Sequence, residues 1–217
     1  MIKLAIFDLD GTLVNSIDDL ADAVNKALKE CGFPTHSVEK YYYFVGDGVK
    51  NLIERALPEN FKSEENIIKV QAIFAKNYEK NYINKTHVYD GIIELSQELK
   101  KLNVKLAVAS NKPDDFTKKI IAELFPKGLF DLVKGNTKGV PHKPNPQIVE
   151  DILLKLEIEK SDCIFIGDTN VDIRTGKNAG MKTVGCLWGF RDLEELQKAG
   201  ADFIVSHPLE ILKQINF

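Results

Sequence analysis

Two kinds of hydrophobic pattern alternate along most of the chain. Short, continuous apolar runs are typical of strands that are buried on both faces of a parallel sheet. The stretches between them repeat apolar positions every three or four residues, which predicts amphipathic helices. This alternation predicts right-handed crossovers and an α/β fold with a doubly wound parallel sheet. The expected strands are residues 2–7, 104–109, 163–166, 183–185 and 203–205, and the expected helices between them are residues 113–124, 146–156, 171–179 and 192–199.

The alternation is interrupted between the first and second expected strands. Residues 16–29 place their apolar side chains on one stripe, and residues 49–57 and 64–78 are also helix-like. Because this interval contains no strand pattern, we expect an all-helical domain inserted into the α/β core. The expected division assigns residues 1–14 and 86–217 to the core, which resumes with a helix at 91–102, and residues 15–85 to the helical insertion.

The composition is typical of a folded globular protein and disfavours some partners. Of the 217 residues, 44% are hydrophobic, which is enough to bury a sizeable core. The net charge is −3 and no Lys/Arg block stands out, so we expect neither a nucleic-acid nor a membrane partner. The three cysteines have no metal-binding spacing, and the first apolar run is too short for a signal peptide. We therefore expect a cytoplasmic protein with free thiols, either a monomer or a homodimer.

The first candidate site follows the first expected strand. Asp8 and Asp10 are two residues apart, so they point to the same side of the chain. Ligands of open α/β sheets bind beyond the carboxyl ends of the strands, which is where these acids lie. Gly11 permits a tight exit from the strand. A strand end that meets solvent is the alternative interpretation of this acid pair.

A second acid pair, Asp168 and Asp172, follows another apolar strand. The two acids are four residues apart at the opening of a helix, so they share one face. Capping of that helix is the alternative role of each acid. Together with the first pair they place four carboxylates at one edge of the sheet, where a divalent cation would relieve their repulsion. Ligation by oxygen atoms alone suits Mg²⁺, so the sequence predicts a magnesium site.

Two further segments are suited to holding phosphate. Ser110 and Asn111 end the second strand, and a hydroxyl with backbone N–H groups at a strand-to-helix turn binds phosphate oxygens. Capping of the next helix is the alternative role of Ser110. Lys143 lies in a loop stiffened by two prolines, which would fix its positive charge against phosphate. An ordinary surface lysine is the alternative there.

These segments, in this order, resemble the haloacid dehalogenase superfamily of phosphohydrolases. The first motif is highly specific, and the others gain specificity from their order. The helical insertion after the first strand is similar to the cap domain of that superfamily, so the resemblance covers essentially the whole chain. The matching segments are Phe7-Asp8-Leu9-Asp10-Gly11-Thr12-Leu13, Ser110, Lys143 and Gly167-Asp168-Thr169-Asn170-Val171-Asp172.

The resemblance implies a role for each candidate residue. Asp8 would be the nucleophile that becomes an aspartyl phosphate, and Asp10 would protonate the leaving oxygen and then activate water. Asp168 would bind Mg²⁺ together with Asp8 and the backbone carbonyl of Asp10. Asp172 would act beside it, through water or by holding Lys143. The implied phosphate- and substrate-binding residues are Leu9, Thr12, Gly48, Ser110, Asn111 and Lys143.

Within the superfamily, the closest likeness is to phosphoglycolate phosphatases. Asn15 stands where Asp is usual and Ser110 where Thr is common, and both departures bear on the substrate more than on hydrolysis. An ordinary turn is the alternative interpretation of the glycine-rich residues 46–48. We expect the aromatic run at residues 41–44 to pack inside the cap or at an interface. The likeness is carried by Val45-Gly46-Asp47-Gly48-Val49 with Leu52, Arg55 and Leu57, by Trp188-Gly189-Phe190, and by Ala199-Gly200-Ala201-Asp202.

The resemblance therefore implies a Mg²⁺-dependent phosphatase that acts on a small phosphorylated metabolite, with 2-phosphoglycolate favoured. Alternatives with the same core are an inorganic pyrophosphatase and a mutase that resembles β-phosphoglucomutase. Dehalogenases and phosphonate hydrolases are disfavoured because they do not use a second acid such as Asp10. A signalling receiver domain also has a phosphorylatable Asp, an acid pair and a lysine, but it has no helical insertion.

Overall fold

The structure, a computed structural model, describes residues 1–214 and divides into two compact units. The α/β unit combines Met1–Val14 with Val88–Phe217, and the helical unit is Asn15–His87. The chain therefore leaves the α/β unit shortly after its first strand and returns to it later. Two short strands, β2 (Val14–Asn15) and β3 (His87–Val88), pair where the chain makes these two passages.

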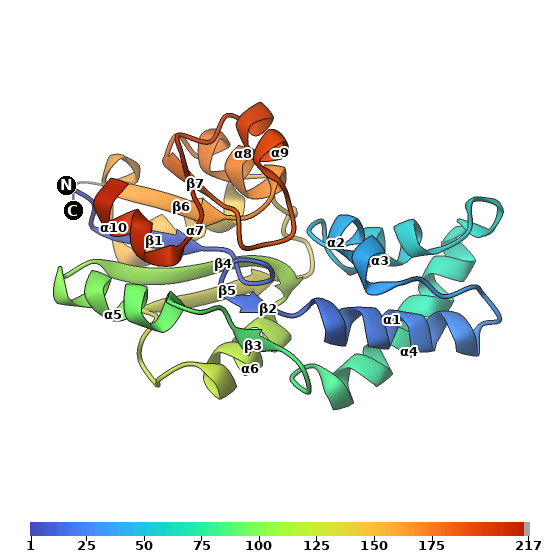
Figure 1. The fold of residues 1–217 in the computed structure, drawn as a ribbon. Coiled ribbons are helices and arrows are strands. Elements are labelled where there is room, and N and C mark those ends of the chain that lie inside the picture. Colours follow the sequence, from blue (N-terminus) through green and yellow to red (C-terminus); the bar gives the residue numbers. More distant parts are fainter. Residues whose placement is uncertain (215–217) are drawn as a thin grey trace. The chain divides into compact units, whose positions relative to one another are not determined.

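Six parallel strands form the sheet of the α/β unit, in the order β5-β4-β1-β6-β7-β8 (Figure 1). The first strand of the chain lies between two strands that come much later, because Phe7 is in register with both Val108 and Ile166. The expected α/β fold with a parallel sheet is confirmed. The strands are β1 (Leu4–Phe7), β4 (Lys105–Pro113), β5 (Leu132–Asn136), β6 (Cys163–Gly167), β7 (Lys182–Cys186) and β8 (Phe203–Val205).

Helices provide the crossovers that parallel strands require. On one face of the sheet, Ile148 and Ile152 of the helix after β5 pack against Leu4 of β1. This burial fixes the central strand beneath the site formed at its carboxyl end. The helices of this unit are α5 (Ile92–Lys101), α6 (Asp114–Leu124), α7 (Gln147–Leu156), α8 (Asn170–Asn178), α9 (Leu193–Ala199) and α10 (Ile211–Gln214), with 3₁₀ turns at Lys160–Asp162 and Pro208–Glu210.

Four helices build the helical unit. Leu20, Val24 and Leu28 form a buried stripe on the first of them, as the hydrophobic pattern predicts. This stripe faces the long fourth helix, whose Val70 and Phe74 are also buried. The helices are α1 (Ile17–Glu30), α2 (Val38–Phe44), α3 (Val49–Ala56) and α4 (Glu64–Asn81), with a 3₁₀ turn at Glu59–Phe61.

The sequence patterns missed β5, the two-residue strands, α2, the short helix α10 and the 3₁₀ turns. Strand β5 is a half-buried edge strand that contains a lysine and a glycine, so it has no continuous apolar run. Helix α2 buries only Tyr41 and therefore shows no apolar stripe. The Tyr41 hydroxyl donates a hydrogen bond to Asn25 Oδ1 at 2.7 Å, so this member of the aromatic run packs inside the helical unit.

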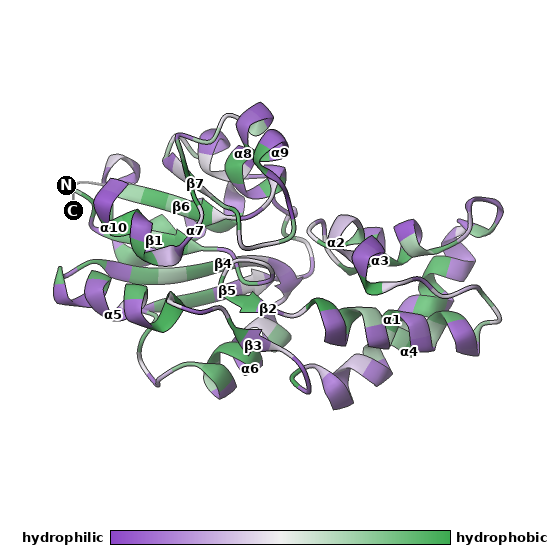
Figure 2. Cartoon of the chain, in the orientation of Figure 1, coloured by the Kyte–Doolittle hydropathy of each residue, from purple (hydrophilic) through white to green (hydrophobic). Residues whose placement is uncertain are grey.

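Hydropathy follows the burial of each element. Figure 2 shows mainly hydrophobic residues along β1 and β6, whereas α1 alternates between apolar and polar residues. Strands buried on both faces need apolar side chains throughout, and a helix at a surface needs only one apolar stripe. Among residues 1–214, no helix combines the length and the apolar character needed to cross a membrane.

Candidate active site

Asp8 and Asp10 lie at the carboxyl edge of the sheet, immediately after β1. The Asp8 N–H donates to the carbonyl of Ile166 at 2.9 Å, which extends the pairing with β6 by one residue. The chain then turns back at Gly11, whose φ of 87° is a conformation that favours glycine. The exposed fraction is 7% for Asp8 and 13% for the Asp10 side chain, so these acids do not simply meet solvent.

Lys143 is buried at the centre of this edge. Its Nζ donates to Asp8 Oδ1 at 2.7 Å, to Asp172 Oδ1 at 2.7 Å and to the Ala109 carbonyl at 2.9 Å. These three contacts match the three N–H groups of an ammonium. The structure therefore excludes the surface-lysine alternative and makes Lys143 the shared partner of two carboxylates.

Asn111 holds the loop that carries Lys143. The Lys143 N–H donates to Asn111 Oδ1 at 2.7 Å, and Asn111 Nδ2 donates to the Lys143 carbonyl at 3.2 Å. The next peptide bond, Lys143–Pro144, is cis. Nearby, Ser110 Oγ accepts a hydrogen bond from the Lys112 N–H at 3.2 Å, and its side chain lies at the edge of the sheet. The Asn111 amide, expected to contact phosphate, thus positions the lysine loop.

Asp172 has two roles at once. Its Oδ2 accepts hydrogen bonds from the Thr169 N–H at 3.1 Å and the Thr169 hydroxyl at 2.7 Å, which forms a capping box at the start of α8. Its Oδ1 accepts the hydrogen bond from Lys143. Asp172 therefore caps α8 through one oxygen and contacts Lys143 through the other, so the two interpretations of this acid are compatible.

Asp168 is fully buried, and each of its carboxylate oxygens has one donor. The Thr12 hydroxyl donates to Oδ1 at 3.0 Å, and the Phe190 N–H donates to Oδ2 at 2.8 Å. Thr12 was expected to contact phosphate, but its hydroxyl is directed to this carboxylate. The sequence patterns gave no indication of the Phe190 N–H, because a backbone donor has no residue type to reveal it.

Burial and mutual repulsion disturb the ionisation of these groups. Burial, followed by the charge of Asp172, raises the pKa of Asp8 to about 7 in spite of the nearby Lys143. Burial and the charges of Asp172 and Asp8 raise the pKa of Asp168 well above its usual range. Burial acts to lower the pKa of Lys143, but the charges of Asp172 and Asp8 outweigh it and raise that pKa. Perturbed carboxyl groups that face one another are a common property of functional sites.

The donor set fits a divalent cation. Asp8, Asp168 and Asp172 each offer one oxygen, and these atoms lie within 4.8 Å of one another. Within this cluster Lys143 is the ammonium that contacts Asp8 and Asp172, so the three carboxylates carry two excess negative charges when all of them are ionised. A divalent cation would balance them, and ligation by oxygen suits Mg²⁺. Asp172 accepts three hydrogen bonds, one of them from the Lys143 ammonium, whereas Asp168 accepts two from neutral donors and Asp8 accepts one from Lys143. Asp8 and Asp168 are therefore the better candidates for direct ligands.

Asp10 has a separate partner that sequence reasoning did not select. Lys112 Nζ donates to both carboxylate oxygens of Asp10, at 2.9 Å and 3.0 Å, and the Lys112 side chain is 4% exposed. Lys112 follows Ser110 and Asn111 on the same strand, β4. The signal in the sequence that could have identified Lys112 is its position two residues after Ser110, which was already a candidate site residue. The two lysines of the site thus hold different carboxylates, Lys143 near Asp8 and Lys112 near Asp10.

The remaining expected site residues, Leu9 and Gly48, lie in different units. Leu9 is fully buried, and its carbonyl accepts hydrogen bonds from Leu13 and Val14 at 2.9 Å and 3.0 Å, so it shapes the turn after β1. Gly48 belongs to the helical unit, where it precedes α3 with a φ of 85°. The residues that the α/β unit brings together are Asp8, Asp10, Ser110, Lys143, Asp168 and Asp172.

Comparison with known proteins gives consistent matches along the chain. The haloacid dehalogenase-like hydrolase family model matches residues 5–186. A phosphoglycolate phosphatase of Aquifex aeolicus is 36% identical, with 99% of this chain and 97% of the relative covered. A phosphoglycolate phosphatase of Vibrio parahaemolyticus is 31% identical, with 99% of this chain and 96% of the relative covered.

A solved structure agrees with these sequence matches. The crystal structure of a protein from Lactobacillus delbrueckii subsp. bulgaricus has a TM-score of 0.92 and 32% identity, and 98% of each chain is covered. The fold, the family model and the full-length relatives therefore indicate the same family as the arrangement of carboxylates and lysine at the sheet edge. The chain belongs to the haloacid dehalogenase-like hydrolase family and is a phosphatase of that family.

Proposed function

We propose that this protein hydrolyses the phosphomonoester of a small metabolite through an aspartyl-phosphate intermediate on Asp8, with 2-phosphoglycolate as the preferred substrate. One observation carries the proposal. The Asp8 carboxylate lies at the carboxyl edge of the sheet, 2.7 Å from the buried Lys143 ammonium and beside two further buried carboxylates. Such a group is surrounded by the charges that phosphoryl transfer requires.

In the first step, an oxygen of the Asp8 carboxylate attacks phosphorus as the bond to the leaving oxygen breaks. Asp10 gives its proton to that leaving oxygen. In the second step, water attacks the phosphorus of the aspartyl phosphate and gives a proton to Asp10. Phosphate leaves, and the Asp8 carboxylate and the protonated Asp10 are restored. The Lys112 ammonium contacts both oxygens of the Asp10 carboxylate and therefore orients the ionised form, which accepts the proton from water in the second step.

The charge balance of the site supports a requirement for Mg²⁺. Asp8 and Asp168, together with the backbone carbonyl of Asp10, would hold the ion. When bound, Mg²⁺ would supply positive charge against the phosphoryl oxygens. Lys143 neutralises part of the charge on Asp8, and it would contact a phosphoryl oxygen by exchanging one of its three present acceptors. Ser110 offers a hydroxyl on β4.

The identity of the substrate is supported by the relatives and by the helical unit. Two full-length relatives at 36% and 31% identity are phosphoglycolate phosphatases. We propose that the helical unit acts as a cap whose turn at Gly46 and Gly48 contacts the substrate. Both glycines have positive φ, and the absence of side chains there permits close approach to a small molecule. Arg55 pairs with Asp47 and donates to the Phe44 carbonyl, which stabilises the conformation of this turn.

A substrate panel tests the proposal. We expect kcat/KM with Mg²⁺ to be highest for 2-phosphoglycolate, when compared with pyrophosphate, hexose phosphates and nucleotides. Pyrophosphate or a hexose phosphate as the best substrate would overturn the choice of 2-phosphoglycolate and leave the phosphatase chemistry intact. Full activity in EDTA without added metal would overturn the magnesium requirement. Failure to trap phosphate on Asp8 by rapid quench would contradict the covalent intermediate.

We place this reaction in the cytoplasm. All three cysteines of the chain, Cys31, Cys163 and Cys186, are free thiols, which is typical of proteins in a reducing compartment. Fractionation of cells of the source organism, with the protein followed by an antibody, tests this placement. Recovery in an extracytoplasmic fraction would contradict it.

A further inference from the structure

The loop after β7 lies directly against Asp168. The Phe190 N–H of this loop donates to Asp168 Oδ2, and on the other side the Thr12 hydroxyl donates to Oδ1. Each oxygen of an ionised carboxylate accepts about two hydrogen bonds or ligand contacts. One acceptor position on each oxygen is therefore taken by a donor from the protein. These two hydrogen bonds set the plane of the carboxylate and the direction of the lone pairs that are left for a cation.

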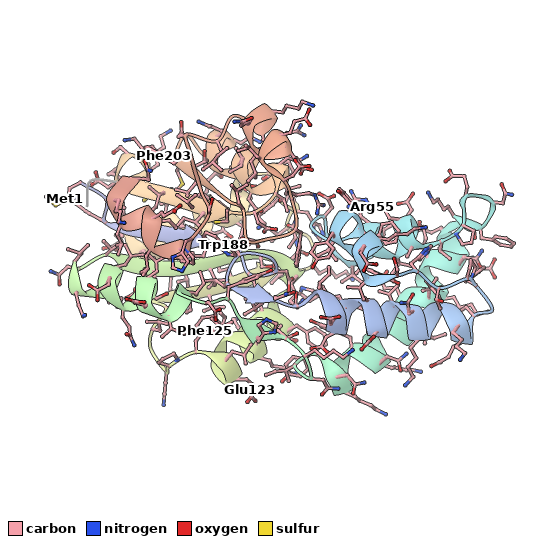
Figure 3. The ribbon with its side chains drawn as sticks, viewed as in Figure 1. Met1, Arg55, Glu123, Phe125, Trp188 and Phe203 are labelled. Carbon is pink, nitrogen blue, oxygen red and sulfur yellow. The ribbon has the colours of Figure 1, made fainter. Side chains whose placement is uncertain are left out.

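The two segments that hold Asp168 are also joined to each other. The indole N–H of Trp188, a residue labelled in Figure 3, donates to the Thr12 carbonyl at 3.0 Å. The loop after β7 is therefore tied to the turn after β1. At its start, the Leu187 N–H donates to the Val205 carbonyl of β8 at 3.0 Å. Phe190 is only 5% exposed, which anchors the other end. The loop is thus fixed at three points around the carboxylate.

Glycines allow both segments to approach Asp168 closely. A Cβ atom added at Gly189 would lie 2.3 Å from Asp168 Cβ and 2.3 Å from the Gly11 carbonyl oxygen. A Cβ atom added at Gly11 would lie 2.3 Å from Asp168 Oδ2. Distances this short are not tolerated, so a side chain at either position would displace the carboxylate. At Gly189 it is the space, and not a positive φ, that requires glycine.

We propose that Trp188-Gly189-Phe190 and Thr12 are positioning residues that hold Asp168 in the orientation needed to bind Mg²⁺. This inference rests on the magnesium site proposed above. Mg²⁺ demands near-octahedral geometry at short distances, so a small rotation of a ligand weakens binding. Hydrogen-bond partners of metal ligands change metal affinity by about 10- to 100-fold when they are removed. The loop therefore contributes to metal affinity without touching the substrate.

Direct metal binding tests this proposal in the full-length protein. Mn²⁺ is the probe, with its Kd measured by electron paramagnetic resonance, and kcat is measured separately over a range of Mg²⁺ concentrations. We expect Thr12→Val and Gly189→Ala to raise the Kd for Mn²⁺ by about 10-fold or more. Trp188→Phe, which removes the indole N–H, is expected to raise the Kd for Mn²⁺ by about threefold. The effect is smaller because the indole contacts the Thr12 carbonyl and not Asp168 itself. The loss of kcat in each variant should become smaller as the Mg²⁺ concentration rises, since a higher concentration compensates for weaker metal binding.

Thr175→Val is the matched control. Thr175 is fully buried like Thr12, but its hydroxyl donates to the Val171 carbonyl inside α8 at 2.7 Å and contacts no site carboxylate. Its Kd for Mn²⁺ should equal that of wild type. Trp188 is the single tryptophan of the chain, so its fluorescence provides a second titration in Thr12→Val, Gly189→Ala and Thr175→Val.

Several outcomes would overturn the inference. An unchanged Kd in Thr12→Val and Trp188→Phe would do so even if Gly189→Ala failed to fold. Weakening of equal size in Thr175→Val would show general loosening of the fold instead of a specific effect on Asp168. If Thr12→Val bound inorganic phosphate more weakly but kept the wild-type Kd for Mn²⁺, Thr12 would be a phosphate-binding residue and not a positioning residue for Asp168. If the wild-type protein bound no Mn²⁺, both the proposed magnesium site and this inference would be wrong. The other outcomes described above would contradict the inference alone and leave the proposed magnesium site unaffected.

Discussion

Asp19 in the helical unit and Asp168 in the α/β unit are both buried carboxylates, with exposed fractions of 2% and 0%. Asp19 accepts hydrogen bonds from the backbone N–H groups of Lys85 and Thr86 and from the Thr86 hydroxyl, at distances of 2.7–3.1 Å. All these donors are neutral and belong to one short segment. Asp19 therefore fixes the end of the helical unit to α1 and needs no cation.

The carboxylates of the α/β unit are satisfied differently. Asp8, Asp168 and Asp172 crowd together, and Lys143 contacts only Asp8 and Asp172 among them. Burial with mutual repulsion raises the pKa of Asp8 and of Asp168. A buried acid with its own set of neutral donors stabilises the fold, whereas crowded acids with too few cations favour ligand binding at the expense of stability. The partners of these acids, and not their burial, thus distinguish the structural acid Asp19 from the acids of the candidate site.

The largest effect that should distinguish the acids of the candidate site from Asp19 is an effect on catalysis. We expect Asp8→Asn to lower kcat by about 10³-fold or more, because the amide is nearly isosteric but is a poor nucleophile. The metal-free variant should unfold at a Tm equal to or above that of wild type, because the change removes a charge that burial and Asp172 disfavour. Steady-state kinetics and calorimetry measure the two quantities. A variant with a tenth of the wild-type kcat would contradict the nucleophilic role.

Asp10 belongs to the candidate site but, like Asp19, it has a partner of its own, the ammonium of Lys112. We expect Asp10→Asn to slow 2-phosphoglycolate by about 10²-fold or more, because proton transfer to the leaving oxygen is lost. Hydrolysis of p-nitrophenyl phosphate should be affected far less, since its leaving group needs little protonation. The ratio of kcat/KM values for the two substrates is the measurement. Equal losses for both would mean that Asp10 orients groups without transferring a proton.

The reliability of sequence-based prediction also differed between regions of the fold. The apolar runs gave β1 and β6 because strands covered on both faces tolerate few polar residues. The edge strand β8 was found because all three of its residues are apolar. Strand β5 was missed because a half-buried edge strand lacks such a run. Helix α1 was recognised from its buried stripe, while α2 buries a single residue and left no periodic pattern.

The sequence indicated the candidate site where chemistry depends on side-chain type. Asp8, Lys143 and Asp172 were selected from their places after strands and in a rigid loop, and the structure joins them by hydrogen bonds. The Phe190 N–H could not be predicted, because backbone donors look alike at every residue. Lys112 was not selected because charge alone does not reveal which lysine of a strand end turns inward; its contact with Asp10 depends on the pairing of β1 with β4.

A smaller effect is expected for the structural acid. Asp19→Asn should lower the free energy of unfolding by about 1–3 kcal/mol, because the amide cannot accept all the hydrogen bonds that the carboxylate accepts. Asp22→Asn is the matched control: Asp22 lies on the same helix, but its side chain is 59% exposed and pairs only with the Lys85 ammonium. The control should change stability by less than about 0.5 kcal/mol. Urea unfolding provides both values, and equal effects would contradict the role of Asp19.

The smallest expected effect concerns pH and metal together. The pKa of Asp8 is raised from its ordinary value to about 7, so between about pH 4 and pH 7 the metal-free folded protein holds a proton that the unfolded chain has lost. The contribution of this group to stability is therefore present at low pH and is lost as pH rises through its folded pKa. Mg²⁺ must displace that proton at low pH but meets an ionised carboxylate at high pH.

We therefore expect saturating Mg²⁺ to raise Tm more at pH 8 than at pH 5.5, by a few degrees in a calorimetric scan. In Asp19→Asn the same difference between the two pH values should persist, because Asp19 belongs to the other unit and its donors are neutral. In Asp168→Asn the gain from Mg²⁺ should be lost at both pH values. An equal gain at pH 5.5 and pH 8 in wild type would mean that the crowded carboxylates are already ionised without the metal, and the distinction between the two kinds of buried acid would lose its electrostatic basis.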